Sequence, residues 1–212
     1  PKLDNAIICA GAGGLTAGAC ISIKHINPQC NVFTAEPDEW NDHQQSFEKN
    51  ARVAVDVNRG GLCDGIMTPT PGEIPFAINQ HYGVKGLSTS DEMVCNAMSF
   101  AFNRLNLKLE PSGAIALACL LDNKEKFKNS RTLIMLSGGN VDEKKLPRYL
   151  LVFHYYLGFA DWGKSYAYWK CYWRIYKNVF KCKKGNEVLR GVINCYWRSC
   201  ISSIFFAPDV NI

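Results

Sequence analysis

The sequence predicts an α/β fold, an open twisted sheet with helices on both faces, and three observations lead to it. Residues 4–18 read as a short apolar strand, a glycine turn and a helix of small residues. Residues 31–35 form a second apolar run after that helix, which makes a strand-helix-strand unit with parallel strands. Residues 131–136 form a third buried-type strand that also ends in a glycine turn.

The turn after the first strand has the sequence Gly11-Ala12-Gly13-Gly14. Glycines allow backbone angles that are closed to other residues, and they let main-chain N–H groups approach an anion at the positive end of the following helix. The turn is therefore a candidate phosphate cradle. The alternative at this point is that the glycines serve packing alone.

The helix over residues 15–26 ends at Asn27-Pro28, and the strand that follows leads to Glu36. An acidic residue at this place also occurs in dinucleotide-binding folds, where it holds a ribose hydroxyl. The fit to the dinucleotide motif Gly-x-Gly-x-x-Gly is imperfect, because its third glycine would fall at Thr16. The dinucleotide-binding fold therefore remains an alternative at this point, and residues further along the chain distinguish the two.

The middle of the chain predicts fewer regular elements. Residues 37–50 are polar and predict a loop and a short helix, residues 52–57 are compatible with a strand, and residues 60–76 are irregular with little room for a long element. A capping pattern ending at Ser90 predicts a helix to about residue 106. Residues 111–121 predict a second helix of small residues.

Composition divides the chain at about residue 142. Residues 1–142 hold 12 Lys and Arg against 15 Asp and Glu with eight aromatic residues, whereas residues 143–212 hold 12 against 4 with 17 aromatic residues. The overall charge of +5 is therefore not the property of one surface. We expect one domain over 1–142 and an atypical aromatic, basic extension of uncertain structure over 143–212.

Ten cysteines lie singly along the chain. The first six stand among apolar neighbours, which is typical of reduced, buried thiols and predicts a cytoplasmic protein. The four in the extension have no regular metal-ligand spacing, so a zinc site there is the less favoured alternative. The chain opens on Pro1 and enters a buried-type strand almost at once, and we expect this beginning to be a cut end.

Five motifs in order carry a resemblance. GAGGLTAG, AEP, CDG, LEPSGAIALA and LSGGNVD together resemble the large domain of the serine/threonine dehydratases and serine racemases, the fold type II pyridoxal-phosphate enzymes, over residues 3–142. The dinucleotide fold predicts neither EPSGA nor SGGN. The resemblance implies a partial, N-terminally truncated, pyridoxal-phosphate-binding catalytic domain over 1–142.

The resemblance implies roles for particular residues. The backbone N–H groups of Gly11, Ala12, Gly13 and Gly14 would hold the cofactor phosphate. The Ser137 hydroxyl would contact the pyridine nitrogen of the cofactor. Glu110 and Gly65 would lie beside the cofactor ring, and Thr68 would lie on the substrate side. Without the family, Ser137 is compatible with a plain turn and Glu110 with an acid at a helix start.

Glu36, Trp40 and Asp42 have the spacing at which related enzymes hold a divalent cation through two carboxylates and one backbone carbonyl. Oxygen ligands of this kind suit Mg²⁺ or Ca²⁺. The carbonyl position is normally a small residue, and Trp40 departs from that pattern. The alternative is a solvated acidic loop.

The family also requires a lysine that forms a Schiff base with the cofactor, in a Ser-x-Lys-x-Arg-Gly setting. No lysine here has that setting, and we expect the region that carries it to precede Pro1. The resemblance thus implies an ammonia-lyase that converts hydroxy amino acids to 2-oxo acids and ammonia, a homo-oligomer when intact, and inactive as this chain. The alternatives are serine racemase activity in the intact protein, or a non-catalytic remnant or accessory subunit.

The extension has three open interpretations. Its apolar stretch 149–162 is too short to span a bilayer, so we expect no membrane span. The aromatic run 169–173 is compatible with stacking on nucleic-acid bases, but we expect no nucleic-acid partner because the periodicity is poor. The composition resembles translated non-coding sequence, and an added interaction or membrane-surface segment is the alternative.

Overall fold

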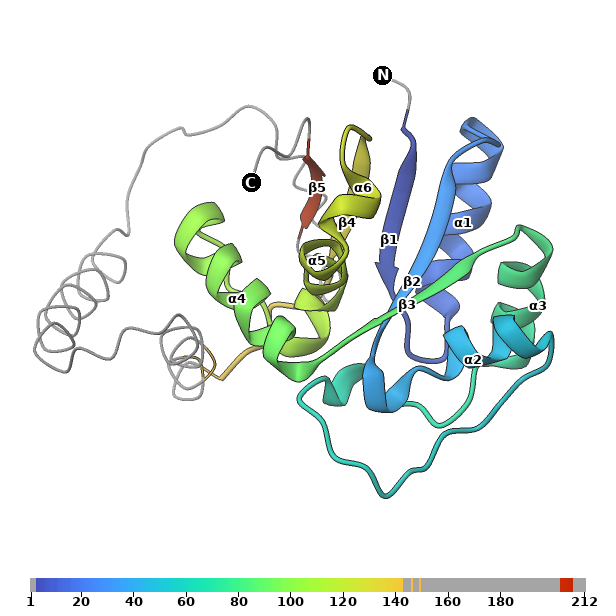
Figure 1. The fold of residues 1–212 in the computed structure, drawn as a ribbon, viewed down its shortest axis with the longest axis horizontal. Helices are drawn as coiled ribbons and strands as arrows, with labels where there is room; N and C mark the ends of the chain where they lie inside the picture. The colour runs from blue at the N-terminus through green and yellow to red at the C-terminus, as the bar shows by residue number, and fades with distance from the viewer. Residues whose placement is uncertain (1–2, 143–145, 147–148, 150–202, 208–212) are drawn as a thin grey trace, which may run out of the picture.

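The computed structural model describes residues 3–142, 146, 149 and 203–207, and these form a five-stranded sheet of order β3-β2-β1-β4-β5 (Figure 1). The first four strands are parallel, and β5 pairs with β4 in the antiparallel sense. The strands are β1 (Asn5–Cys9), β2 (Asn31–Pro37), β3 (Lys85–Thr89), β4 (Thr132–Leu136) and β5 (Ser203–Ala207).

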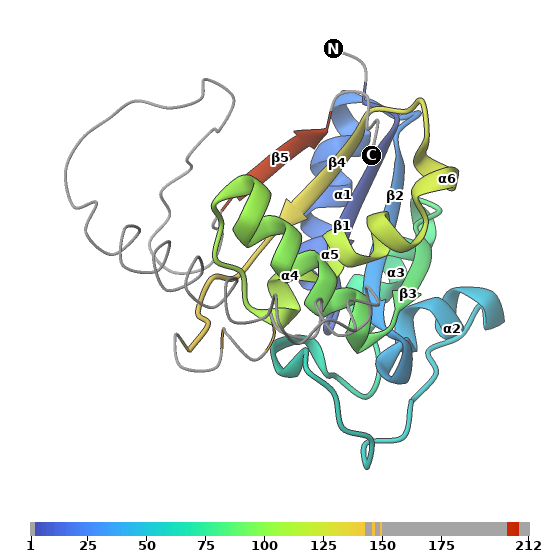
Figure 2. The same cartoon turned by 60° about the vertical axis from the view of Figure 1, so that its left-hand side comes forward.

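Helices cover both faces of the sheet, as expected for parallel strands that are buried on both sides (Figure 2). One face carries α4 (Asp91–Leu105), α5 (Pro111–Asp122) and α6 (Lys124–Phe127). The other carries α1 (Gly14–Ile26), α2 (Asp42–Lys49) and α3 (Glu73–His81). Two short 3₁₀ turns complete the set: η1 (Asp38–Trp40) lies between β2 and α2 in sequence, and η2 (Asp64–Ile66) lies between α2 and α3.

The core is built around α5. Its residues from Pro111 to Leu120 are all buried, and they pack with Ile7, Phe33 and Ile134 of the sheet. Gly113 allows the closest approach, because a Cβ there would collide with the backbone carbonyls of Ser137 and Gly138. The helix therefore lies tightly against the end of β4, which fixes the turn that follows this strand.

The predicted elements are largely present. The first strand, the first helix, the second strand and the strand at 132–136 occur within a few residues of the predicted limits. The helix that begins after Ser90 has the expected cap, since the Ser90 hydroxyl accepts a hydrogen bond from the N–H of Met93 at 3.3 Å.

The middle of the chain differs from the prediction in three places. Residues 52–57 form no strand, and Val55 bonds instead to the carbonyl of Pro69. Residues 60–72 hold no element longer than η2, as predicted, but α3 begins at Glu73, inside the last part of the segment predicted as irregular. Pro75 lies in the first turn of α3, where its missing N–H costs nothing. The short edge strand β3, which contains Gly86, was not predicted.

Most of the extension lies outside the described residues, including 150–162 and 169–173, on which the membrane and stacking predictions rest. Within the part that the structure describes, β5 adds a strand to the edge of the sheet beside β4. None of the helices found there is both long enough and apolar enough to cross a bilayer.

Candidate cofactor site

The parallel strands β1, β2 and β4 all end at the same edge of the sheet. The chain leaves β1 toward β2 on one side, while β4 lies on the other side of β1, so the strand order reverses beside β1. Ligands of open α/β sheets bind in the crevice at such a reversal. The glycine turn follows β1 there, and Ser137 follows β4.

The carbonyl groups of the glycine turn are engaged by the protein. Gly11 accepts from the ring Nε2 of His43, Ala12 from the N–H of Gly72, and Gly13 from the N–H of Ala17, each at 2.9 Å. The N–H groups of residues 11–14 have no hydrogen-bond acceptor among the described residues. The turn thus directs its acceptors into the protein and leaves four donors for a ligand.

The backbone angles of the turn suit this arrangement. Gly13 has φ +90°, which favours glycine, and a Cβ there would also collide with the His43 ring. Ala12 has no positive φ, so an alanine is tolerated and still offers its N–H. Gly14 begins α1 at the positive end of the helix dipole, and a Cβ there would meet no atom within 4 Å.

Ser137 lies at the end of β4, 9% exposed, and its hydroxyl oxygen is 2.9 Å from the sulfur of Cys9 at the end of β1. Burial raises the pKa of the Cys9 thiol, so this group is neutral. Gly138 follows with φ +87° and turns the chain away from the strand.

Glu110 occupies the space beside this turn. Its Oε2 accepts a hydrogen bond from the N–H of Asn140 at 3.1 Å, and a Cβ on Gly138 would collide with its Oε1. A Cβ on Gly65 would lie 4.0 Å from the same oxygen, and the Gly65 N–H donates to the Ser112 hydroxyl at 3.0 Å. The structure therefore brings Glu110, Gly65 and the end of β4 together.

The 64–68 segment also contacts the glycine turn, since a Cβ on Gly11 would lie 3.2 Å from the Cα of Ile66. Thr68, predicted on the substrate side, follows at the end of this segment. Its hydroxyl is buried without a hydrogen-bond partner in the described part of the chain.

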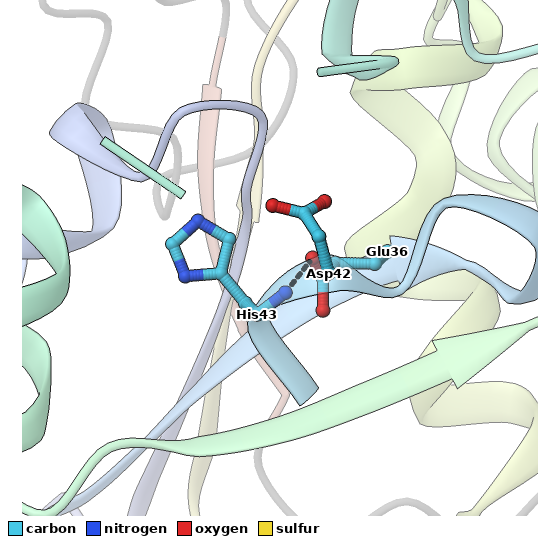
Figure 3. Close-up of side chains that lie close together, drawn as sticks. All are labelled: Glu36, Asp42 and His43. Atoms are coloured by element: carbon cyan, nitrogen blue, oxygen red, sulfur yellow. Dashed lines mark hydrogen bonds between the residues drawn. The ribbon is translucent and has the colours of Figure 1, made fainter. Parts of the chain in front are cut away.

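A second cluster, Glu36, Asp42 and His43, lies where β2 leads into α2, and its potential ligand atoms are within 4.8 Å of one another (Figure 3). All three side chains are completely buried. The N–H groups of His43 and Gln44 donate to the Glu36 carboxylate at 2.9 and 3.0 Å. Both oxygens of Asp42 lack a partner among the described residues.

Burial governs the charges in this cluster. It raises the pKa of Glu36, with the neighbouring Asp42 carboxylate adding to the effect, and it raises the pKa of Asp42 to about 7. It lowers the pKa of His43 to about 4, although the bond to Gly11 opposes this. Two buried carboxyl groups, one of them with both oxygens unpartnered among the described residues, fit a divalent cation better than a solvated loop.

The structure also places Trp40, the third predicted ligand. Its side chain is 4% exposed and turned toward the next loop, where the indole N–H donates to the Gly60 carbonyl at 3.2 Å. The bulk of the indole is thus accommodated by the 60–61 backbone. His43, by contrast, was missed by sequence reasoning, and nothing in the sequence beyond its place next to Asp42 indicates a role.

The fold and the site together define an α/β domain with four backbone N–H groups, unpartnered among the described residues, at the carboxyl edge of a parallel sheet, an arrangement suited to a phosphorylated ligand. The family of pyridoxal-phosphate-dependent enzymes matches residues 1–138, and the chain belongs to that family. This confirms the resemblance, the fold class and pyridoxal phosphate as the cofactor of the family.

Individual proteins of known activity or structure are also similar to this chain. The serine racemase of Schizosaccharomyces pombe is 36% identical over 148 residues, which are 70% of this chain and 46% of that protein. The L-threo-3-hydroxyaspartate ammonia-lyase of Saccharomyces cerevisiae is 33% identical over 144 residues, 68% of this chain and 44% of that protein. The solved serine racemase from Dictyostelium discoideum has a TM-score of 0.60 at 32% identity, covering 66% of this chain and 45% of its own. The chain spans less than half the length of these relatives.

Proposed function

We propose that this chain forms the phosphate- and ring-binding part of a pyridoxal-phosphate-dependent ammonia-lyase that converts hydroxy amino acids to 2-oxo acids and ammonia. One observation carries the proposal. The N–H groups of residues 11–14 have no acceptor among the described residues, while the carbonyls of the same turn are held from behind. A phosphate at the start of α1 supplies the missing acceptors.

The remaining groups of the site fit the cofactor ring. Ser137 would present a neutral hydroxyl to a pyridine nitrogen, and Gly65 and Glu110 lie close together beside the same turn. When bound, the cofactor supplies an electron sink for loss of the α-proton of an amino acid. A hydroxyl partner keeps the ring nitrogen largely unprotonated and therefore moderates that sink, which suits elimination of a β-hydroxyl.

The substrate class follows from the relatives. They are named as serine racemase, L-threo-3-hydroxyaspartate ammonia-lyase and L-threonine ammonia-lyase, and all three names refer to amino acids with a β-hydroxyl group. Serine racemase activity of the whole protein is the second candidate, favoured by the relative at 36% identity. We also infer a homo-oligomer, and a cytoplasmic location in keeping with the six free, buried cysteines of the described residues.

We further propose that Glu36 and Asp42, with the backbone carbonyl of Trp40, hold Mg²⁺ or Ca²⁺. The proposed cation site is supported by the two Asp42 oxygens, which have no partner among the described residues and lie beside the buried Glu36 carboxylate. Hard cations prefer oxygen ligands of this kind. A cation would also remove the cost of burying two ionised groups together.

The variant Gly14→Asp tests the phosphate site. Position 14 has open space around it and starts a helix, where an acid is tolerated, so the fold should persist. A carboxylate there repels a phosphate. Pyridoxine 5′-phosphate is a suitable probe because its alcohol, unlike an aldehyde, forms no adducts with surface lysines. We expect the variant to bind it at least about ten-fold more weakly, measured by calorimetry.

Gly18→Asp is the matched control, because it adds the same charge to an open position one turn further along α1. It should leave the dissociation constant within about two-fold of the unmodified chain, since charge effects of a helix end fall off within one turn. Equal binding by the Gly14→Asp variant and the unmodified chain contradicts the phosphate site.

A further inference from the structure

The buried thiol of Cys9 stands at the centre of the proposed cofactor site without a role in the proposed function. It ends β1, directly before the glycine turn, and is 6% exposed. Its sulfur lies 2.9 Å from the Ser137 hydroxyl oxygen, across 128 residues of chain. The two side chains meet at the reversal of strand order, between the ends of β1 and β4.

Ser137 is held firmly by its backbone but only weakly by its side chain. Gly113 of α5 packs against its carbonyl so closely that a Cβ would collide with it. Its hydroxyl has a single hydrogen-bond partner among the described residues, and that partner is Cys9. Without the thiol, the hydroxyl proton would be free to rotate between its staggered positions.

The number of protons in this pair decides their direction. A serine hydroxyl has one proton to donate and two lone pairs to accept with, and a thiol has one proton to donate. An unprotonated pyridine nitrogen can only accept. If Ser137 donated to Cys9, it would have no proton left for such a ring, whereas a thiol that donates to Ser137 leaves the hydroxyl proton for the ring.

We propose that Cys9 is a positioning residue: its S–H donates to the Ser137 oxygen and thereby directs the Ser137 O–H toward the ring nitrogen of the bound cofactor. This rests on the proposed function. The proposal requires an unprotonated ring nitrogen, because a protonated nitrogen has no lone pair left to accept the Ser137 proton and could only donate to the Ser137 oxygen. Burial keeps the proton on the thiol, since it raises the pKa of Cys9.

The test compares two ligands on the full 212-residue chain. One is pyridoxine 5′-phosphate, and the other is its analogue with C–H in place of the ring nitrogen. The ratio of their dissociation constants reports the contact to the nitrogen alone, because both carry the same phosphate. Ser137→Ala should abolish any preference for the nitrogen. Cys9→Ala should reduce the preference by about three- to ten-fold, the range of one modest hydrogen bond.

Matched variants separate positioning from packing. Cys9→Ser keeps a donor at the same place and should retain the preference, whereas Cys9→Val fills the space without a donor and should lose it. Cys20→Ala removes another buried thiol, on α1, and should change nothing. The Cys9→Val and Cys9→Ser pair decides the question even where Cys9→Ala does not fold.

The outcomes are distinguishable. An unchanged preference in both Cys9→Ala and Cys9→Val overturns the role of Cys9 while leaving the cofactor site intact. Failure of the unmodified chain to bind either phosphate ligand overturns the proposed function itself, and the inference with it. A preference that falls equally in Cys9→Ser and Cys9→Val shows a packing effect and also overturns the positioning role.

Discussion

His43 is the residue through which the two clusters of the site touch. Its ring donates to the Gly11 carbonyl of the glycine turn, and its backbone N–H donates to Glu36 of the carboxylate pair. A carbonyl oxygen can only accept, so the ring proton lies on Nε2. The pKa of about 4 keeps the ring neutral near pH 7. His43 therefore braces the turn from behind with an uncharged donor.

Replacing His43 with phenylalanine should destabilise the chain. The variant keeps a ring that packs against Phe47, but it leaves the partly buried Gly11 carbonyl without its donor. An unsatisfied buried acceptor costs about 1–3 kcal/mol, and a partly buried one belongs at the lower end of that range. We expect the free energy of unfolding, measured with urea, to fall by about that amount and the binding of pyridoxine 5′-phosphate to weaken.

The exposed His25 of α1 provides the control. His25→Phe should change the free energy of unfolding by less than about 0.5 kcal/mol. If His43→Phe is as stable as the unmodified chain and binds the phosphate equally well, the ring does not brace the turn.

Single residues of this site differ in how far sequence predicts them. The glycines of the turn at 11–14 can be predicted from sequence, because a turn between a strand and a helix needs their backbone freedom. Glu110 and Ser137 were predicted through the motifs around them, and the structure brings them together. Cys9 and His43 were not predicted, because their contacts span 128 and 32 residues and depend on which strands become neighbours.

At the scale of elements, the end of β2 and the first turn of α2 force two carboxyl groups into one buried space. Glu36 receives two backbone N–H donors, but Asp42 receives none from the described residues. Without a cation, burial raises the pKa values of Glu36 and Asp42, so the two carboxyl groups stay protonated to a higher pH than exposed carboxyl groups do. We therefore expect the junction of these two elements to respond to pH and, through the proposed cation site, to divalent cations.

Asp42→Asn should reveal this sensitivity in the presence of a chelator. The folded-state pKa of Asp42, about 7, lies above its ordinary value of 3.8, so the folded chain binds more protons than the unfolded chain between these limits. The contribution of Asp42 to stability is therefore fully present below about pH 4 and is lost as pH rises through 7. Relative to the unmodified chain, the variant should gain about 1–3 kcal/mol between pH 5 and pH 8.

His43 acts in the opposite sense, since its lowered pKa costs stability as pH falls from 6.5 toward 4. Both proteins carry His43, so the difference between their urea midpoints reports Asp42 together with its effect on the neighbouring Glu36. Mg²⁺ at pH 8 should raise the melting temperature of the unmodified chain and not that of the variant. Asp38→Asn, at an exposed neighbouring acid, is the control. A constant difference across pH contradicts the burial of an ionising pair.

Elements differ in predictability for a related reason. The unit β1-α1-β2 was predicted because its apolar periodicity and its glycine turn are local signals. The helix α3 was hidden because prolines crowd its start, at positions 69, 71 and 75, and β3 because it is five residues long and contains Gly86. Gly86 has a tertiary cause, since a Cβ there would collide with Gln44 of α2.

At the scale of the whole molecule, we expect cofactor binding and covalent chemistry to be separable. All the groups assigned to the cofactor lie at the carboxyl edge of the sheet. Lys85 begins β3, at the opposite edge, and Lys24 lies in the last turn of α1, where its Nζ donates to the Pro28 carbonyl at 3.2 Å. Neither lysine stands at the cofactor site, and the Ser-x-Lys-x-Arg-Gly setting occurs nowhere in residues 1–212.

We therefore expect the 212-residue chain to bind pyridoxal phosphate reversibly and without turnover. Gel filtration should strip the cofactor, and serine or threonine should yield 2-oxo acid no faster than with free pyridoxal phosphate. Borohydride reduction followed by peptide mapping should give the same scattered surface adducts in the unmodified chain and in the Gly14→Asp variant. A single lysine that is modified only in the unmodified chain, together with product formation, would show that these residues suffice for covalent catalysis.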